Sequence, residues 1–343
     1  YFMEKLILKK RIPIFFSVDD NYIPFLAVSL QSLEKHANKT NIYLIKVLHA
    51  NSISENNQKM IKDSYSNDIF DIEFVNIAEY VEKISSRLHT RDYYSKSTYY
   101  RLFIPNLYPE FNKAIYLDSD ITVLKDISRL YNIPLGNNLV GAIPDESVQL
   151  IKEFQDYVEN RVGVDSYKNY FNAGILVMNL KKLREINFED MFINLVSSVT
   201  FDVAQDQDYL NAICRNRVKY ISNTWNKMPF PNERIKEPFI NLIHYNLDMK
   251  PWQQDNILYE KYFWEAAKAT NYYERILEIK ANVSPEKVEK AKAQTVALIN
   301  RTREQAMDDN ENARIREIIN DICGFDEDEN DLLLSLNNIS PIA

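Results

Sequence analysis

Short apolar runs alternate with amphipathic stretches over the first third of the chain, and few folds accommodate this pattern. The apolar runs cover residues 12–18, 41–50, 70–77 and 113–117. Helix signals lie between them: Asn21 can cap a helix that has Pro24 in its first turn, and Ser54 stands three residues before Asn57. Strands that alternate with helices predict an α/β fold in which helices cover both faces of a mostly parallel sheet.

The rest of the sequence indicates a continuation of this fold and then a helical end. We expect a strand that ends at Asp145, a strand entered through Asn172 and Gly174, a helix over residues 203–216, and a strand or loop over residues 240–252. From about Phe263 the sequence becomes charged and helical. We therefore predict a main domain at residues 1–265 and a helical appendage at residues 266–343.

Charge and cysteine usage restrict the partners and the compartment. The 343-residue chain has a formal net charge of −8 and a pI near 5.3, which argues against nucleic acid as a partner. Cys214 and Cys323 are the only cysteines, and we expect both to be free thiols in a reducing compartment. The sequence has no signal-peptide pattern and no apolar run of ~20 residues, so we expect a cytoplasmic protein.

Two polar clusters follow predicted strands, at what should be the same edge of the sheet. Asp19 and Asn21 follow the first strand, and Asp118 and Asp120 follow the fourth. Ligands of such sheets bind at the carboxyl ends of the strands. The aspartate pair could hold a metal, supply a nucleophile with its acid/base partner, or only end a strand, and the local sequence fits all three.

One hypothesis for this pair is a phosphatase of the haloacid-dehalogenase type. The stretch DSDIT matches its D-x-D-x-[TV] pattern, with Asp118 as the nucleophile and Asp120 as the acid/base. That family also needs the motif close to the N-terminus and a later acidic metal-binding loop, usually with a glycine. Here the motif lies over a hundred residues into the chain and no Gly-Asp pair follows it. The phosphatase pattern is therefore incomplete.

The other hypothesis is a nucleotide-sugar transferase, whose diphosphate leaving group gains negative charge that a divalent cation neutralises. Asp118 and Asp120 can both face such a cation if the chain bends between them, and His244 is the best third ligand among the four histidines. Two carboxylates and one imidazole suit Mn²⁺, or alternatively Mg²⁺. Lys250 can then neutralise phosphate charge.

Six segments stand in an order and spacing that resembles the retaining glycosyltransferases of family 8, which include lipopolysaccharide galactosyltransferases and glycogenin. They are SVDDNY (17–22), STYYRL (97–102), YLDSDITV (116–123), YFNAGILVMNLKKLR (170–184), QDQDYLN (205–211) and HYNLDMKPW (244–252). The resemblance covers roughly residues 12–263. It implies the GT-A type of nucleotide-diphospho-sugar transferase fold, with residues 1–265 as the catalytic domain. It also implies transfer of a hexose, glucose or galactose, from a UDP-sugar with retention at the anomeric carbon.

The resemblance further implies a role for each matching residue. The metal ligands would be Asp118, Asp120 and His244, the diphosphate contact Lys250, the uracil contacts Asp19, Asn21 and Tyr22, and the donor-sugar contacts Arg101, Asn172 and Asp206. The catalytic residues would be Asp206, Asp145 on the acceptor side, and Gln207 near the anomeric carbon. Because Gln207 is an amide and a poor nucleophile, we favour a front-face route in which the leaving phosphate helps to deprotonate the acceptor.

One position departs from the family, and several alternatives stay open. Leu247 stands where the family commonly has glycine, and because leucine prefers negative φ we expect the backbone there to approach a ligand less easily. Asp19 could be only a helix cap. The acceptor could be a glycan, a lipid-linked sugar or a protein, and the appendage could contact a membrane surface or a second subunit. A non-catalytic protein that binds nucleotide sugars is a further alternative.

Overall fold

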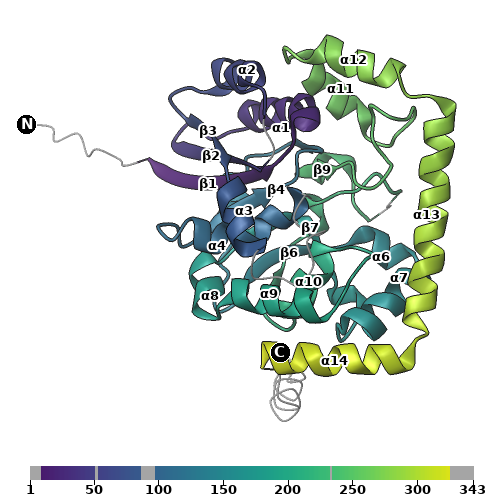
Figure 1. Ribbon diagram of the computed structural model, residues 1–343. Coiled ribbons are helices and arrows are strands. Elements are labelled where there is room, and N and C mark those ends of the chain that lie inside the picture. Colours follow the sequence, from purple (N-terminus) through teal and green to yellow (C-terminus); the bar gives the residue numbers. More distant parts are fainter. Residues whose placement is uncertain (1–8, 51–52, 86–96, 232–233, 325–343) are drawn as a thin grey trace, which may run out of the picture.

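Seven strands form the central sheet, in the order β3-β2-β1-β4-β7-β6-β8 (Figure 1). The computed structural model describes residues 9–50, 53–85, 97–231 and 234–324. The strands are β1 (Lys10–Ser17), β2 (Asn41–His49), β3 (Phe70–Asn76), β4 (Ala114–Leu117), β6 (Val140–Pro144), β7 (Phe171–Met178) and β8 (Val218–Tyr220). All neighbouring pairs are parallel except those that β7 makes with β4 and β6. The predicted α/β fold with a mostly parallel sheet is confirmed.

Helices cover both faces of this sheet, so that its central strands are buried on both sides. Alternate residues of β1 enter different apolar clusters, Ile14 and Phe16 on one face and Phe15 on the other. The helices up to residue 213 are α1 (Ile23–Lys35), α2 (Glu55–Tyr65), α3 (Ala78–Ser85), α4 (Ile104–Leu107), α5 (Ser128–Tyr131), α6 (Glu146–Leu150), α7 (Lys152–Tyr157), α8 (Leu180–Glu185), α9 (Phe188–Ser198) and α10 (Asp206–Ile213).

A second, two-stranded sheet lies beside the first and joins two distant parts of the sequence. It pairs β5 (Ile121–Val123) with β9 (Leu242–His244) in antiparallel fashion, so that Ile121 lies opposite His244. A further bridge between Lys227 and Ile243 extends it. This pairing brings the segment after β4 next to the one that follows β9.

Between residue 259 and residue 324, where the described part of the chain ends, four helices follow one another: α11 (Glu260–Lys268), α12 (Tyr273–Ala281), α13 (Pro285–Ala306) and α14 (Asp309–Cys323). The boundary predicted at residues 265/266 falls inside α11, where Phe263 and Ala267 belong to the apolar cluster that also contains α1. Helix α13 runs along one side of the molecule from α12 to α14 (Figure 1). Within the described part of the chain, none of the helices has the length and apolar character needed to cross a membrane.

Candidate active site

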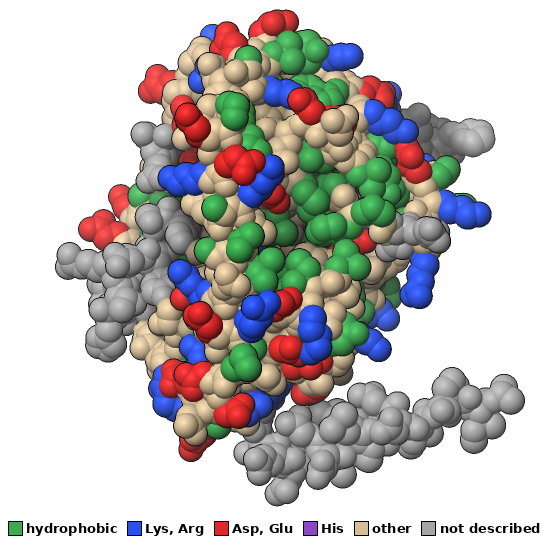
Figure 2. Space-filling model, turned by 90° about the vertical axis from the view of Figure 1, so that its right-hand side faces the viewer, with side chains coloured by type: hydrophobic (Ala, Val, Ile, Leu, Met, Phe, Trp, Pro, Cys, Tyr) green, Lys and Arg blue, Asp and Glu red, His purple; other side chains and the backbone are tan. Residues whose placement is uncertain are grey.

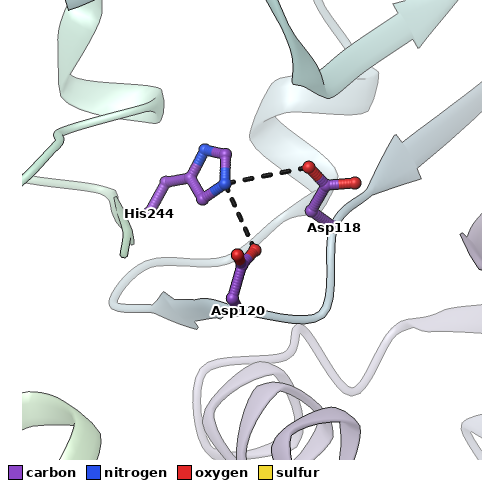
Figure 3. Close-up of side chains that lie close together, drawn as sticks. All are labelled: Asp118, Asp120 and His244. Carbon is purple, nitrogen blue, oxygen red and sulfur yellow. Dashed lines mark ion pairs between the residues drawn. The ribbon is translucent and has the colours of Figure 1, made fainter. Parts of the chain in front are cut away.

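Asp118, Asp120 and His244 converge on one point at the carboxyl end of β4 (Figure 3). His244 Nε2 lies 3.2 Å from Asp120 Oδ1 and 3.7 Å from Asp118 Oδ2. The imidazole is buried, Asp120 is 13% exposed and Asp118 is 27% exposed, so the cluster has one open side. One ligand atom from each residue lies within 4.8 Å of the other two.

The local fold explains why these side chains meet. The chain bends at Ser119 between β4 and β5, and Ser29 of α1 holds this bend by donating to the carbonyls of Ser119 (2.6 Å) and Ile121 (3.0 Å). The backbone N–H of Tyr245 donates to the Asp120 carbonyl at 2.9 Å, next to the pair formed by β5 and β9. The metal-ligand candidates are therefore positioned by main-chain pairing as well as by their own contacts.

Gly174 of β7 leaves room for this cluster. A Cβ atom at this position would lie 2.5 Å from His244 Cε1 and 2.6 Å from Asp118 Oδ2, closer than real Cβ contacts. The carbonyl of Gly174 also accepts a hydrogen bond from the Asp118 backbone N–H at 2.8 Å. The close packing of His244 and Asp118 against β7 thus depends on the absence of a side chain at residue 174.

The donor atoms fit a divalent cation. Asp120 Oδ1 is buried and accepts no hydrogen bond, although it lies beside His244 Nε2. Lys250 Nζ donates to the other oxygen, Asp120 Oδ2, and to the Tyr245 carbonyl. Burial would raise the pKa of Asp120, but Lys250 and His244 together lower it below the ordinary range of an aspartate. An ionised carboxylate with one buried, unshared oxygen beside an imidazole is the donor set that Mn²⁺ or Mg²⁺ would need.

A buried guanidinium links this cluster to α10. Arg101 lies 3.2 Å from Asp118 Oδ1 and 3.0 Å from Asp206 Oδ2, with its guanidinium over the ring of Tyr116. Burial raises the pKa of Asp206 to about 6, although Arg101 opposes this shift. Arg101 therefore pairs with a carboxylate of the cluster, Asp118, and with a carboxylate of α10, Asp206.

Asn172, Asp145 and Gln207 form a second polar group beside the first. Asp145 Oδ2 accepts hydrogen bonds from Asn172 Nδ2 and Gln207 Nε2, both at 3.0 Å. Gln207 Oε1 accepts from Asn172 Nδ2 (3.1 Å) and from the Ala173 backbone N–H (2.9 Å). Asp145 Oδ1 in turn caps α6 by accepting from the N–H groups of Ser147 and Val148. The structure thus brings the three predicted residues into one network.

The segment after β1 forms the other side of the site. Asp19 caps a short 3₁₀ turn (Asp20–Tyr22), where its Oδ1 accepts from the N–H groups of Asn21 (2.9 Å) and Tyr22 (3.2 Å). Burial raises the pKa of Tyr22, and the negative charges of Asp120, Asp19 and Asp118 raise it further. The capping role of Asp19 was one of the two alternatives, and uracil contact by these residues stays a prediction.

Sequence reasoning assigned no role to two buried residues in or near the site. Asn226 lies between His244 and Asn172 and belongs to none of the six segments. Asp208 follows Gln207 in α10, and its carboxylate accepts from the hydroxyls of Tyr157 (3.0 Å) and Tyr170 (2.6 Å). Both residues are recognisable only by their partners, which lie far away in the sequence, so no local signal could have revealed them.

The family model of glycosyl transferase family 8 matches residues 13–256, which is most of the chain. The chain belongs to glycosyl transferase family 8. A Haemophilus influenzae protein described as a glycosyltransferase is 33% identical over 229 residues, which are 65% of this chain and 66% of that protein. The chain thus spans slightly less than two thirds of this relative's length.

Solved structures of glycosyltransferases share the fold of this family-8 chain. A galactosyltransferase LgtC, solved with donor and acceptor sugar analogues, is 26% identical with a TM-score of 0.61, over 76% of this chain and 96% of that one. The bifunctional WbbM enzyme has a TM-score of 0.68 and 26% identity, over 80% of this chain and 52% of that one. The predicted family and the GT-A type of fold are confirmed.

The backbone of Leu247 departs from the usual preference of leucine for negative φ. Leu247 has φ +54°, the left-handed conformation that a glycine adopts most easily. The turn around it is held by Asn246, whose Oδ1 accepts from the Leu247 N–H at 2.7 Å and whose carbonyl accepts from the Met249 N–H at 3.2 Å. Because the leucine side chain is 42% exposed, it meets little crowding. This family-8 chain therefore keeps a glycine-like backbone with a leucine in place.

Two cavities are bordered by predicted site residues, and α13 lines both of them. The larger, about 670 Å³, is bordered by Asn21, Tyr22 and Trp252 together with Val288 of α13. The smaller, about 200 Å³, is lined by Asp145, Asn172, Gln207, Leu247 and Leu298, the last from α13. Figure 2 looks onto the side along which α13 runs, and hydrophobic side chains gather in the middle of that face.

Proposed function

We propose that this chain is a metal-dependent, retaining hexosyltransferase that uses a UDP-sugar, UDP-glucose or UDP-galactose, as its donor. The observation that carries the proposal is the convergence of Asp118, Asp120 and His244 on one point, with Lys250 beside them. A divalent cation, Mn²⁺ or Mg²⁺, held there would neutralise charge on the diphosphate leaving group. Lys250 would add a second positive charge on the same side.

The donor extends in two directions from this cluster. Asp19, Asn21 and Tyr22 would hold the uracil, and the lining of the larger cavity by Asn21 and Tyr22 supports this placement. On the other side, Arg101, Asp206 and Asn172 would hold the sugar hydroxyls. All three are buried and carry polar atoms next to the cluster.

The acceptor would enter the smaller cavity, where Asp145 and Gln207 lie. Both polar atoms of the Gln207 side chain are already hydrogen-bonded, which suits a residue that orients a reacting group better than one that attacks it. A front-face reaction needs no protein nucleophile, so it is compatible with this arrangement and with retention. The acceptor would be a glycan, a lipid-linked sugar or a protein, and the reaction would take place in the cytoplasm.

Relatives support a hexose as the transferred sugar. Family members include a lipopolysaccharide 1,2-glucosyltransferase of Escherichia coli and a lipopolysaccharide 1,3-galactosyltransferase of Salmonella typhimurium, 22% and 24% identical to this chain. A donor screen with several UDP-sugars would distinguish glucose from galactose. The C-terminal helices could add contact with a membrane surface or a second subunit, which co-sedimentation with vesicles and light scattering would test.

Calorimetric titration of UDP with and without Mn²⁺ tests the donor site. We expect UDP to bind at least tenfold more tightly in the presence of Mn²⁺, because a cation held by the carboxylates would neutralise charge on the diphosphate. Asp120→Ala should remove this difference, whereas Asp71→Asn, on the exposed edge of β3, should leave it intact. UDP binding that is indifferent to metal in the unmodified chain would contradict the proposal.

Hydrolysis and transfer assays separate an enzyme from a binding protein. A transferase should release UDP from its donor slowly in water and faster with an acceptor, and Asp120→Ala should abolish both. A non-catalytic protein would bind UDP without releasing the sugar. A phosphatase would hydrolyse a phosphate ester, and the phosphoryl group could be trapped on Asp118. The family match does not favour this outcome.

A further inference from the structure

We propose that Asn226 is a positioning residue that fixes the tautomer of His244 and ties it to Asn172. The inference rests on the proposed role of His244 as a metal ligand. Asn226 is 2% exposed and lies between the two side chains, with His244 Nδ1 at 3.0 Å from its Oδ1 and Asn172 Oδ1 at 3.0 Å from its Nδ2. The orientation of every amide in this chain of contacts follows from backbone N–H groups.

The first step fixes Asn172. The backbone N–H of Gly174 can only donate, and it lies 3.0 Å from one polar atom of the Asn172 side chain, which must therefore be the oxygen. The Asn172 nitrogen then faces Asp145 Oδ2 at 3.0 Å and Gln207 Oε1 at 3.1 Å, both acceptors. A flipped Asn172 amide would place donor against donor and acceptor against acceptor.

The second step fixes Asn226 and, through it, His244. Since Asn172 Oδ1 accepts, the Asn226 atom facing it must be the donating nitrogen, and the Asn226 oxygen faces His244 Nδ1. An amide oxygen only accepts, so Nδ1 carries the hydrogen. In the neutral ring, Nε2 then presents its lone pair toward Asp118 and Asp120. This is the tautomer that a metal ligand needs.

The backbone around Asn226 is held firmly enough for this task. The Lys227 N–H donates to the Leu242 carbonyl and the His244 N–H donates to the Lys227 carbonyl, both at 3.0 Å. The Lys227 ammonium is fully buried and bonded to both carboxylate oxygens of Glu146, at 2.9 and 2.8 Å. Asn226 is thus carried by a segment fastened to β9 on one side and to α6 on the other.

The same contacts join the two polar groups of the site. Asn226 contacts the metal-ligand group through His244 and the acceptor-side group through Asn172, which bonds Asp145 and Gln207. A change at Asn226 should therefore affect both metal affinity and the placement of Gln207. Loss of a side chain that orients a metal-bound histidine typically weakens metal affinity about 10–100-fold.

The tautomer is measured directly in the full chain labelled with ¹⁵N-histidine, without metal or donor, over a pH series that reaches values at which the imidazole is neutral. We expect the long-range ¹H–¹⁵N spectrum to show His244 with its hydrogen on Nδ1, assigned by its loss in His244→Gln. In Asn226→Ala we expect a shift toward the other tautomer and a rise of about 10–100-fold in the Kd for Mn²⁺ measured by calorimetry. Asn41→Ala, which removes another buried asparagine, should change neither.

Asn226→Asp separates the two contacts. Its carboxylate can still accept from His244 Nδ1, so the tautomer and most of the Mn²⁺ affinity should be retained, but it meets Asn172 Oδ1 as a second acceptor, so kcat should fall. An Nε2-protonated His244 in the unmodified chain, or an Asn226→Ala variant with unchanged tautomer and Kd, would overturn the inference. Because the tautomer is read without metal, it decides on Asn226 independently of whether the proposed transferase activity is found.

Discussion

Among single residues, Gly174 is the position where one substitution tests the metal-ligand cluster most directly. In Gly174→Ala the new methyl group would displace His244 or Asp118, since the Cβ would lie 2.5 and 2.6 Å from their side chains. We expect the Kd for Mn²⁺ to rise at least tenfold, because both displaced groups are metal-ligand candidates. Calorimetric titration with Mn²⁺ in the absence of donor checks this, with urea unfolding to record the accompanying loss of stability.

Gly136→Ala is the matched control for that variant. Unlike Gly174, Gly136 has a positive φ, +57°, and a Cβ there would meet no atom within 4 Å. The substitution should cost about 1–2 kcal/mol of stability through the left-handed backbone and leave Mn²⁺ affinity unchanged. If both alanine variants weakened Mn²⁺ binding equally, the cause would be a general loss of stability and not the displacement of His244 or Asp118.

The sequence predicted the residues that carry charge better than those that orient them. Asp118, Asp120 and His244 stand at strand ends, where a pattern in the sequence has a direct structural meaning. Asn226 and Asp208 act through hydrogen bonds to residues far away in the chain, so their importance depends on tertiary contacts. Leu247 shows the reverse: its residue type predicts a negative φ, and the turn built around Asn246 overrides that preference.

At the scale of elements, α13 is the helix whose position has the clearest consequence for activity. Its Leu298 lines the smaller cavity beside Gln207, while Val296 points away and is 58% exposed. We expect Leu298→Ala to raise the acceptor KM several-fold and to leave UDP affinity in the presence of Mn²⁺ unchanged. Initial rates over an acceptor series, together with UDP titration, test this expectation.

Val296→Ala removes a similar apolar side chain from the other face of the same helix, so it controls for a loss of helix stability. It should leave both the acceptor KM and UDP affinity at their original values. An equal rise in acceptor KM in both variants would show that α13 acts through its stability and not through the side chain that lines the cavity.

Element types could be predicted, but their directions and neighbours could not. The alternation of apolar runs and helix signals predicted β1 to β4 because period and capping are local properties. The antiparallel direction of β7 was not predicted, since a strand buried on both faces has the same pattern in either direction. The amphipathic pattern of α13 likewise shows which face is buried but not which surface it covers.

For the molecule as a whole, two buried carboxyls on α10 should govern part of the pH dependence of stability. Burial raises the pKa of Asp206 and of Asp208 to about 6, above the ordinary value of 3.8. The folded state therefore binds more protons than the unfolded state between these values, and the contribution of each group to the free energy of unfolding falls as pH rises from about 4 to about 6. The fall is at most about 1.4 kcal/mol per pH unit for one group.

Asp208→Asn isolates one of these contributions. The difference in unfolding free energy between the original chain and the variant should decrease from pH 4 to pH 6 and stay constant above about pH 7. Urea unfolding at a series of pH values measures this difference. Two curves that run parallel over the whole range would contradict the shift assigned to Asp208.

The pairing of β5 with β9 also gives the site a place in the order of folding. Ile121 and His244 are more than a hundred residues apart, so the loop between them closes late compared with local contacts. A nascent or partly unfolded chain without this pairing has the two aspartates but no imidazole beside them. Metal affinity would then appear only with the completed fold, and a bound cation would slow unfolding without accelerating the earlier steps.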